Sequence, residues 1–240
     1  MIRQFGPAQL HLGDALDVMN TLRPGYAMVL ADPPYCSGGA HIGDRSAPTS
    51  AKYQSSNHRG LYPEFAGDTR DQRSYLAWSD LWMRRARQLT RPGGLLCVFS
   101  DWRQLPVTTD AVQAAGWTWR GIVPWDKTER GRPQQGRYRA QAEYVVWATN
   151  GTRPLAGRVA PGVFRIPVDN RKHHIAGKPV ALMEGLLQLA DGAVLDPYMG
   201  SGTVGLACLR LGLPYVGIEV TEDYYKVACS RLDDAFKAAA

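Results

Sequence analysis

The sequence predicts a doubly wound α/β fold with a mostly parallel sheet, because strand and helix signals alternate along most of its 240 residues. The runs YAMVLA (26–31) and LLCVFS (95–100) are continuously apolar over strand length, which is typical of strands buried on both faces. A third apolar strand, AVLDPYM (193–199), precedes the helical segment TVGLACLRLG. The segments WTWRGIVPW (117–125) and AEYVVWATN (142–150) indicate a β pair, antiparallel if the two are neighbours.

Helix boundaries are marked by residues that start or stop helices. Residues 74–90 place apolar side chains at helical intervals, and Arg91-Pro92-Gly93-Gly94 is expected to end that helix. Pro179 is expected in the first turn of the helix PVALMEGLLQLA. Thr221 is a candidate N-cap for the last helix, with Glu222 and Asp223 in the first turn, where the helix dipole favours acids.

The length of 240 residues predicts a single domain over residues 1–240, and the composition, 45% hydrophobic and 21% charged, is that of a folded protein with a sizeable core. No apolar run approaches the ~20 residues of a membrane span, and the N-terminus lacks a basic segment followed by an apolar one. We therefore expect a cytoplasmic protein with no membrane partner. The four cysteines lack C-x-x-C spacing, and the adjacent His173 and His174 lack a third ligand, so no metal site and no disulfides are expected.

Three segments interrupt the alternation and are expected to be loop insertions. Residues 36–73 and 150–178 are too long and irregular for ordinary connections, and loops of that length are usually functional or disordered. Residues 126–140 contain five basic residues against two acidic ones, and residues 151–178 contain six against one. This concentration of charge, in a chain of net charge +6, permits a polyanionic partner without identifying one.

The segment DPYMGSGTVG (196–205) contains the spacing G-x-G-x-x-G between an expected strand and an expected helix. Glu219 ends the next strand, about 20 residues further on, where an acid can bind both ribose hydroxyls. These features suit NAD and S-adenosylmethionine equally. Asp196 favours the second, because an acid before the turn would repel a pyrophosphate and attract the ammonium of a sulfonium amino acid.

The tetrapeptide Asp32-Pro33-Pro34-Tyr35 directly follows the buried strand 26–31. Ligands of doubly wound sheets bind outside the carboxyl ends of the strands, and two prolines fix the local carbonyls rigidly. An acid, a rigid carbonyl and an aromatic ring together form a receptor for a planar base with an exocyclic amino group. In this arrangement Asp32 and the Pro33 carbonyl accept the two N–H hydrogens, and Tyr35 stacks on the ring.

Together, ADPPY and DPYMGSGT resemble the amino-methylating DNA methyltransferases, and their order resembles the permuted β class of that family. LGDAL (12–16), PGGLLCVFSDW, IVPWDK, AEYVVWATNG and HIAGKPVALMEGLL are similar to further motifs of the family. The resemblance spans roughly residues 10–232 apart from the long loops. It implies a Rossmann-like methyltransferase sheet. Tyr198 departs from the usual Phe, Ile175 departs from the usual Pro, and a separate target-recognition domain is missing.

The resemblance implies a role for each residue at a matching position. The residues implied in binding the cofactor S-adenosylmethionine are Asp14, Ala15, Lys178, Asp196, Tyr198, Gly200, Gly202, Thr203 and Glu219. Among these, Asp14 would contact the cofactor adenine, Glu219 the ribose, and Lys178 would lie near the methionine end. The residues implied in holding the target base and in catalysis are Asp32, Pro33, Pro34 and Tyr35.

The expected substrate is an adenine flipped out of double-stranded DNA and methylated at N6. Asp at position 32 favours adenine, because the cytosine-N4 enzymes of the family more often carry Ser there; cytosine N4 is the alternative. The three insertions are expected to recognise the DNA target, and Gln134, Gln135 and Asn57 are candidate base readers. The residues expected to contact phosphates are Lys127, Arg130, Arg132, Arg137 and Arg139.

Other assignments stay open at this point. A homodimer would add recognition surface to so small a chain, and the resemblance implies the cytosol or nucleoid of a prokaryote or phage. An RNA or protein methyltransferase would use the same cofactor. A dehydrogenase would use the same glycines but leaves DPPY unexplained, and a DNA-binding module without activity would not need Asp32 and Glu219.

Overall fold

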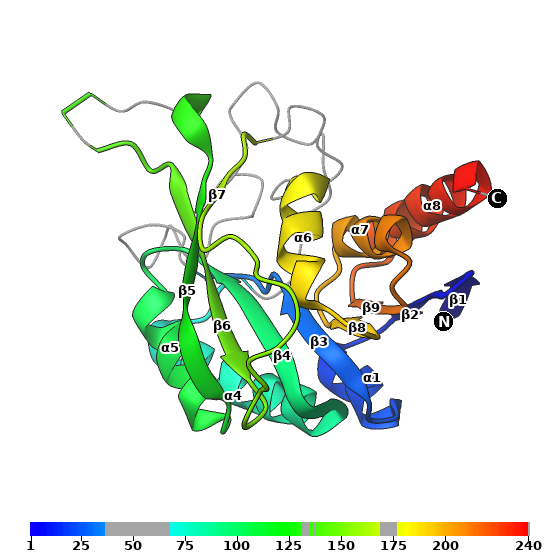
Figure 1. Ribbon diagram of the computed structural model, residues 1–240, viewed down its shortest axis with the longest axis horizontal. Helices are drawn as coiled ribbons and strands as arrows, with labels where there is room; N and C mark the ends of the chain where they lie inside the picture. Colours follow the sequence, from blue (N-terminus) through cyan, green and yellow to red (C-terminus); the bar gives the residue numbers. More distant parts are fainter. Residues whose placement is uncertain (37–67, 131–134, 137, 169–176, 240) are drawn as a thin grey trace.

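A nine-stranded sheet forms the centre of the computed structural model, which describes residues 1–36, 68–130, 135–136, 138–168 and 177–239 (Figure 1). In spatial order the strands are β1 (Ile2–Phe5), β2 (Ala8–Leu12), β9 (Tyr215–Glu219), β8 (Val194–Asp196), β3 (Tyr26–Ala31), β4 (Thr90–Ser100), β6 (Ala142–Thr149), β5 (Thr118–Asp126) and β7 (Phe164–Arg165). Strands β2, β9, β8, β3 and β4 are parallel to one another. Strand β6 is antiparallel to both β4 and β5, and β1 is antiparallel to β2.

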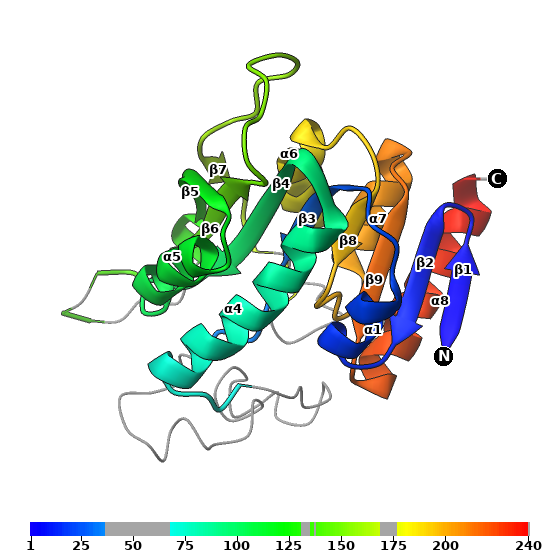
Figure 2. The same cartoon turned by 90° about the horizontal axis from the view of Figure 1, so that it is seen from below.

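Helices cover both faces of this sheet, which confirms the predicted doubly wound α/β fold (Figures 1 and 2). One face carries α1 (Ala15–Thr21), α4 (Gln72–Leu89) and α5 (Leu105–Ala114). The other carries α6 (Val180–Leu186), continued by the 3-10 turn η3 (Leu187–Leu189), with α7 (Thr203–Leu211) and α8 (Glu222–Ala239). A further 3-10 turn, η2 (Thr128–Arg130), follows β5. None of the described helices is long and apolar enough to cross a membrane.

Strand β3 separates two hydrophobic cores. All six of its residues are buried, as the continuous apolar run predicts. Successive side chains of a strand point to opposite faces. Accordingly, Met28 and Leu30 belong to the core under α6, α7 and α8, and Val29 and Ala31 to the core under α1, α4 and α5. The strand is thus fixed from both sides up to Asp32.

The structure differs from the sequence-based prediction at a few boundaries. The helix before residue 90 ends at Leu89 as expected, but Arg91 to Gly94 belong to β4, which pairs with β3 across a register shift. Pro179 is the N-cap of α6 rather than a residue of its first turn. Strands β1 and β7 were not predicted. Both are short strands at the two edges of the sheet. The pair β5–β6 is antiparallel as expected.

The strand order sets the position of the site. The chain order reverses between β8 and β3, which is the switch point where open α/β sheets bind ligands. Asp14, Asp32, Asp196 and Glu219 lie at or just beyond the carboxyl ends of β2, β3, β8 and β9. Because these four strands are parallel, their carboxyl ends lie on the same side of the sheet, and the four acids gather there.

Candidate active site

A cavity of about 510 Å³ lies at the carboxyl ends of these strands and is lined by both sequence motifs. The predicted site residues that line it are Asp14, Ala15, Asp32, Pro33, Pro34, Tyr35, Lys178, Asp196, Tyr198, Gly200, Thr203 and Glu219. Its volume falls in the range of about 300–1,000 Å³ typical of small-molecule sites. The structure therefore brings the DPPY segment and the Gly-rich loop to a single cavity.

Gly202 is the predicted cofactor residue that the structure does not bring to the cavity wall. It is the N-cap of α7 with φ +80°, and a Cβ there would lie 2.9 Å from Leu232 Cδ1 and 3.1 Å from Ala228 Cβ. Arg231 donates to the backbone oxygen of Ser201 (2.6 Å) and to its hydroxyl (2.9 Å). The loop thus rests directly on α8, and this close approach requires glycine.

Glu219 is held by backbone donors. Its carboxylate accepts hydrogen bonds from the N–H of Gly200 (2.9 Å) and the N–H of Thr221 (2.8 Å). Burial raises the pKa of Glu219, and the two backbone hydrogen bonds act in the opposite direction. Each oxygen has a second lone pair, so the fixed carboxylate can accept further hydrogen bonds from a ligand.

Asp196 is almost fully buried beside the Gly-rich loop. It accepts hydrogen bonds from the N–H of Tyr198 (3.1 Å) and the hydroxyl of Tyr215 (3.0 Å). Burial raises the pKa of Asp196 to about 8. A cationic group bound beside this carboxyl would favour its ionised form.

Aromatic side chains from α4 and from the Gly-rich segment form one side of the cavity. Tyr198 meets Trp82 edge-on at a centroid distance of 5.2 Å and Trp78 at 5.5 Å. The guanidinium of Arg70 lies 4.3 Å from the centroid of the Trp78 ring. Asp14 lines the same cavity and caps α1 by accepting from the N–H of Leu16 (2.8 Å). Apolar ring surface next to a fixed carboxylate suits a nucleobase.

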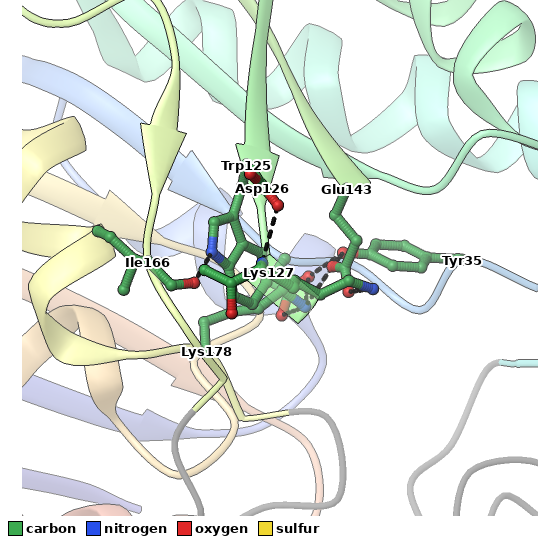
Figure 3. A network of polar contacts seen from close by, with 9 residues as sticks. Tyr35, Trp125, Asp126, Lys127, Glu143, Ile166 and Lys178 are labelled. Carbon is green, nitrogen blue, oxygen red and sulfur yellow. Dashed lines mark hydrogen bonds and ion pairs between the residues drawn. The ribbon is translucent and has the colours of Figure 1, made fainter. Parts of the chain in front are cut away.

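A second group of polar side chains includes Tyr35, Lys127, Glu143 and Lys178 (Figure 3). The ammonium of Lys178 donates to both oxygens of Asp32 (3.0 and 2.8 Å) and lies 3.3 Å from Glu143 Oε2. The Tyr35 hydroxyl lies between the same two carboxylates, 2.8 Å from Asp32 Oδ1 and 3.1 Å from Glu143 Oε2. Lys127 donates to Glu143 Oε1 at 3.2 Å. Two carboxylates, two ammonium groups and a phenol thus form one partly buried network, in which Lys178 is the buried member.

Burial and neighbouring charges act in opposite directions on the pKa values of this network. Burial alone would raise the pKa of Glu143, but the ammonium groups of Lys178 and Lys127 hold it below its usual value. Burial would lower the pKa of Lys178, but Asp32 and Glu143 hold it above its usual value. The pKa of Asp32 is raised, because burial outweighs the attraction of Lys178. Lys178 and Glu143 are therefore charged at neutral pH.

Comparison with known proteins identifies the family. Over residues 26–230 the sequence matches the N6/N4 methyltransferase family, described as DNA methylase. The chain belongs to this family. It is 28% identical over 225 residues to YubD of Escherichia coli (strain K12), which is named provisionally as a methylase, covering 92% of this chain and 88% of YubD.

Two solved structures share the fold of this DNA methylase. The complex of M1.HpyAVI with SAM superposes with a TM-score of 0.66 at 22% identity, covering 94% of this chain and 99% of the other. The cytosine-N4-specific PvuII DNA methyltransferase superposes with a TM-score of 0.70 at 14% identity, covering 96% and 91%.

Some residues of the cavity are not among the sequence-based predictions. Glu143 lies at the start of β6, opposite Trp125 of β5, and its signal was an acid at the head of an otherwise apolar strand. Trp78 was assigned only to the helix pattern of residues 74–90, yet it lines the cavity. Lys178 was expected near the methionine end of the cofactor. In the structure its ammonium pairs with Asp32, and both residues line the cavity that also contains Asp196; the position relative to the cofactor stays a prediction.

The residues expected to contact DNA divide into two sets. Lys127 lines the cavity and pairs with Glu143, while the Arg139 guanidinium donates to the backbone oxygen of Glu129. The side chains and residues that fall outside the described part of the chain are Arg130 (side chain), Arg132, Arg137, Gln134, Asn57, His173, His174 and Ile175. Within the described ranges, no three His, Cys, Asp or Glu side chains gather as a metal site.

Proposed function

We propose that this DNA methylase transfers the methyl group of S-adenosylmethionine to N6 of an adenine flipped out of double-stranded DNA. One observation supports it above the rest: a single cavity is lined by the DPPY segment on one side and the Gly-rich loop with Glu219 on the other. A two-part cavity of this kind suits a reaction between a nucleobase and a nucleoside cofactor.

The residues of the Gly-rich side fit S-adenosylmethionine. The fixed carboxylate of Glu219 has free lone pairs for ribose hydroxyls, and buried Asp196 can receive the ammonium of the methionine portion. Tyr198 and Trp78 offer ring surface for the adenine. When bound, S-adenosylmethionine would supply an electrophilic methyl group on a sulfonium, and breaking of that C–S bond would leave S-adenosylhomocysteine.

The residues of the DPPY side fit the nucleophile. The lone pair of an exocyclic amino group is delocalised into the ring, which makes it a poor nucleophile. If Asp32 and the Pro33 carbonyl accept its two hydrogens, the nitrogen becomes pyramidal and positive charge develops next to a carboxylate. As the new N–C bond forms, the nitrogen loses one proton towards Asp32. Tyr35 replaces part of the stacking that the base loses on leaving the duplex.

Cytosine N4 is the second candidate acceptor. Asp32 and the Pro33 carbonyl accept hydrogens from either amino group, and the fold is shared with the cytosine-N4-specific PvuII enzyme. We favour adenine because residue 32 is Asp and not the Ser more common among the cytosine enzymes that this sequence resembles. The same acceptors could serve a base in RNA, which is a weaker proposal for a member of a DNA methylase family.

We also propose that residues 1–240 act as one methyltransferase domain whose insertions recognise the target sequence. A homodimer would let a second copy add recognition surface. Both proposals rest on the small size of the chain and on the basic residues of the insertions.

The test is a methylation assay with DNA from a strain that lacks DNA methyltransferases. The protein is incubated with this DNA and S-adenosylmethionine, and the digested nucleosides are identified by mass spectrometry. We expect N6-methyladenine. N4-methylcytosine alone would replace adenine with the second candidate, and transfer to RNA but not to DNA would contradict both.

A further inference from the structure

The ammonium of Lys178 lies where the proposed function requires the target amino group. It donates to both oxygens of Asp32, at 3.0 and 2.8 Å, and is 5.2 Å from the centroid of the Tyr35 ring. It also lies 5.2 Å from the centroid of the Phe99 ring. Lys178 therefore occupies the acceptor and the aromatic face that the base would use. A base can bind Asp32 in this way only after the ammonium has moved.

Moving a buried ammonium away from its carboxylate is unfavourable unless another carboxylate receives it. Lys178 is itself buried, with 8% of its surface exposed. Glu143 Oε2 is 3.3 Å from its Nζ, so a second partner is already within reach. Glu143 is held in place by Lys127 at 3.2 Å and by the Tyr35 hydroxyl at 3.1 Å. A small shift of Lys178 towards Glu143 would keep the ammonium paired.

We propose that Glu143 is a positioning residue that receives Lys178 when the target base enters, and so frees Asp32 to accept the amino hydrogens. The inference rests on the proposed function, because it assumes that Asp32 holds the base. Before DNA binds, Lys178 keeps Asp32 paired. Once the base is in place, the pair Lys178–Glu143 leaves Asp32 as the carboxylate nearest the developing positive charge.

The substitution Glu143→Gln isolates the charge of this residue. The amide oxygen can still accept from Tyr35, but the full negative charge that would draw Lys178 from Asp32 is lost. Lys178 then remains on Asp32 in a larger fraction of molecules, and only the remaining fraction can bind the base. Because phosphate contacts dominate the affinity of proteins for DNA, the loss should appear in kcat and not in KM for DNA.

The experiment is a double-mutant cycle with Lys178→Met, using unmethylated DNA and tritiated S-adenosylmethionine. With Lys178 present, we expect Glu143→Gln to lower kcat about 30-fold while KM for DNA stays within about twofold. In the Lys178→Met background the same substitution should lower kcat by less than about threefold, because no ammonium remains to be moved. Glu184→Gln, which removes an exposed ion pair with Arg210 at 3.0 Å, is the matched control and should leave kcat unchanged.

The outcomes separate the two proposals. A wild-type protein that transfers no methyl group to DNA would overturn the proposed function. A wild-type protein that is active, with Glu143→Gln equally harmful in both backgrounds, would overturn only the role of Glu143. If Glu143→Gln does not fold, Glu143→Asp takes its place in the cycle. The Asp side chain is one methylene shorter, so its carboxylate lies farther from Lys178. This substitution should lower kcat about fivefold with Lys178 present and less than twofold without it.

Discussion

The two sides of the cavity hold their carboxylates in different ways. On the Gly-rich side, Glu219 is fixed by two backbone N–H groups, and Asp196 by a backbone N–H and a tyrosine hydroxyl. On the DPPY side, Asp32 and Glu143 are held by Lys178, Lys127 and Tyr35. The backbone donors lie within four residues of the ends of β8 and β9, whereas the ammonium groups of Lys178 and Lys127 stand at the ends of long side chains. We therefore infer that the Gly-rich side is preformed and that the DPPY side rearranges.

The largest effect is expected from removing the carboxylate of the DPPY side. Asp32→Ala should lower the rate of methyl transfer by about 1,000-fold or more, because the amino hydrogens and the developing charge lose their acceptor. Isothermal titration with S-adenosylhomocysteine should give an unchanged Kd, since the Gly-rich side is intact. Equal losses in transfer and in cofactor affinity would contradict the division between the two sides.

The next effect concerns the preformed side. In Glu219→Gln an amide replaces the carboxylate that accepts from Gly200 and Thr221, so one of these N–H groups faces another donor. We expect cofactor affinity to fall by about 2 kcal/mol, close to 30-fold, as measured by calorimetry. Binding of the protein to DNA without cofactor should not change. If DNA affinity fell by about the same factor as cofactor affinity, the Gly-rich side would not be independent of the DNA.

A smaller effect follows from the raised pKa of Asp196. The folded protein keeps the Asp196 carboxyl protonated up to about pH 8. The contribution of Asp196 to the free energy of unfolding therefore falls as pH rises from about 4 to about 8. A cationic ligand favours the ionised form, so its binding releases the proton. The Kd of S-adenosylhomocysteine should therefore tighten roughly tenfold between pH 6.5 and pH 8. Asp196→Asn should abolish this slope, and a slope that persists in the variant would assign it to another group.

The smallest effect is expected at Tyr198. Its hydroxyl oxygen is buried and has no hydrogen-bond partner among the described residues. Tyr198→Phe removes this unsatisfied group and should raise the free energy of unfolding by up to about 1 kcal/mol, measured by thermal or denaturant unfolding. Methyl transfer should stay within about twofold of the wild type. A marked loss of cofactor affinity would mean that the hydroxyl binds the cofactor.

The contrast between the two sides also explains what the sequence could predict. DPPY and the Gly-rich loop each follow an apolar strand of a parallel sheet, so the topology brings them together at the carboxyl ends of these strands. Glu143 lies close to these carboxyl ends because β6 is antiparallel to β4, so β6 begins where the parallel strands end. Neither the register of β6 nor the direction of the long Lys178 side chain can be deduced from local sequence. DPPY and the Gly-rich loop were therefore predictable from the sequence, whereas Glu143 and its ion pair with Lys178 were not.

The contact between Gly202 and α8 has a consequence for the order in which the protein is made. The loop that holds Gly200 and Ser201 rests on Ala228, Arg231 and Leu232, which follow both motifs in the chain. A ribosome thus releases the DPPY segment first, and the support of the Gly-rich loop after everything else in the site. We therefore expect the nascent chain to bind cofactor only after α8 has been synthesised.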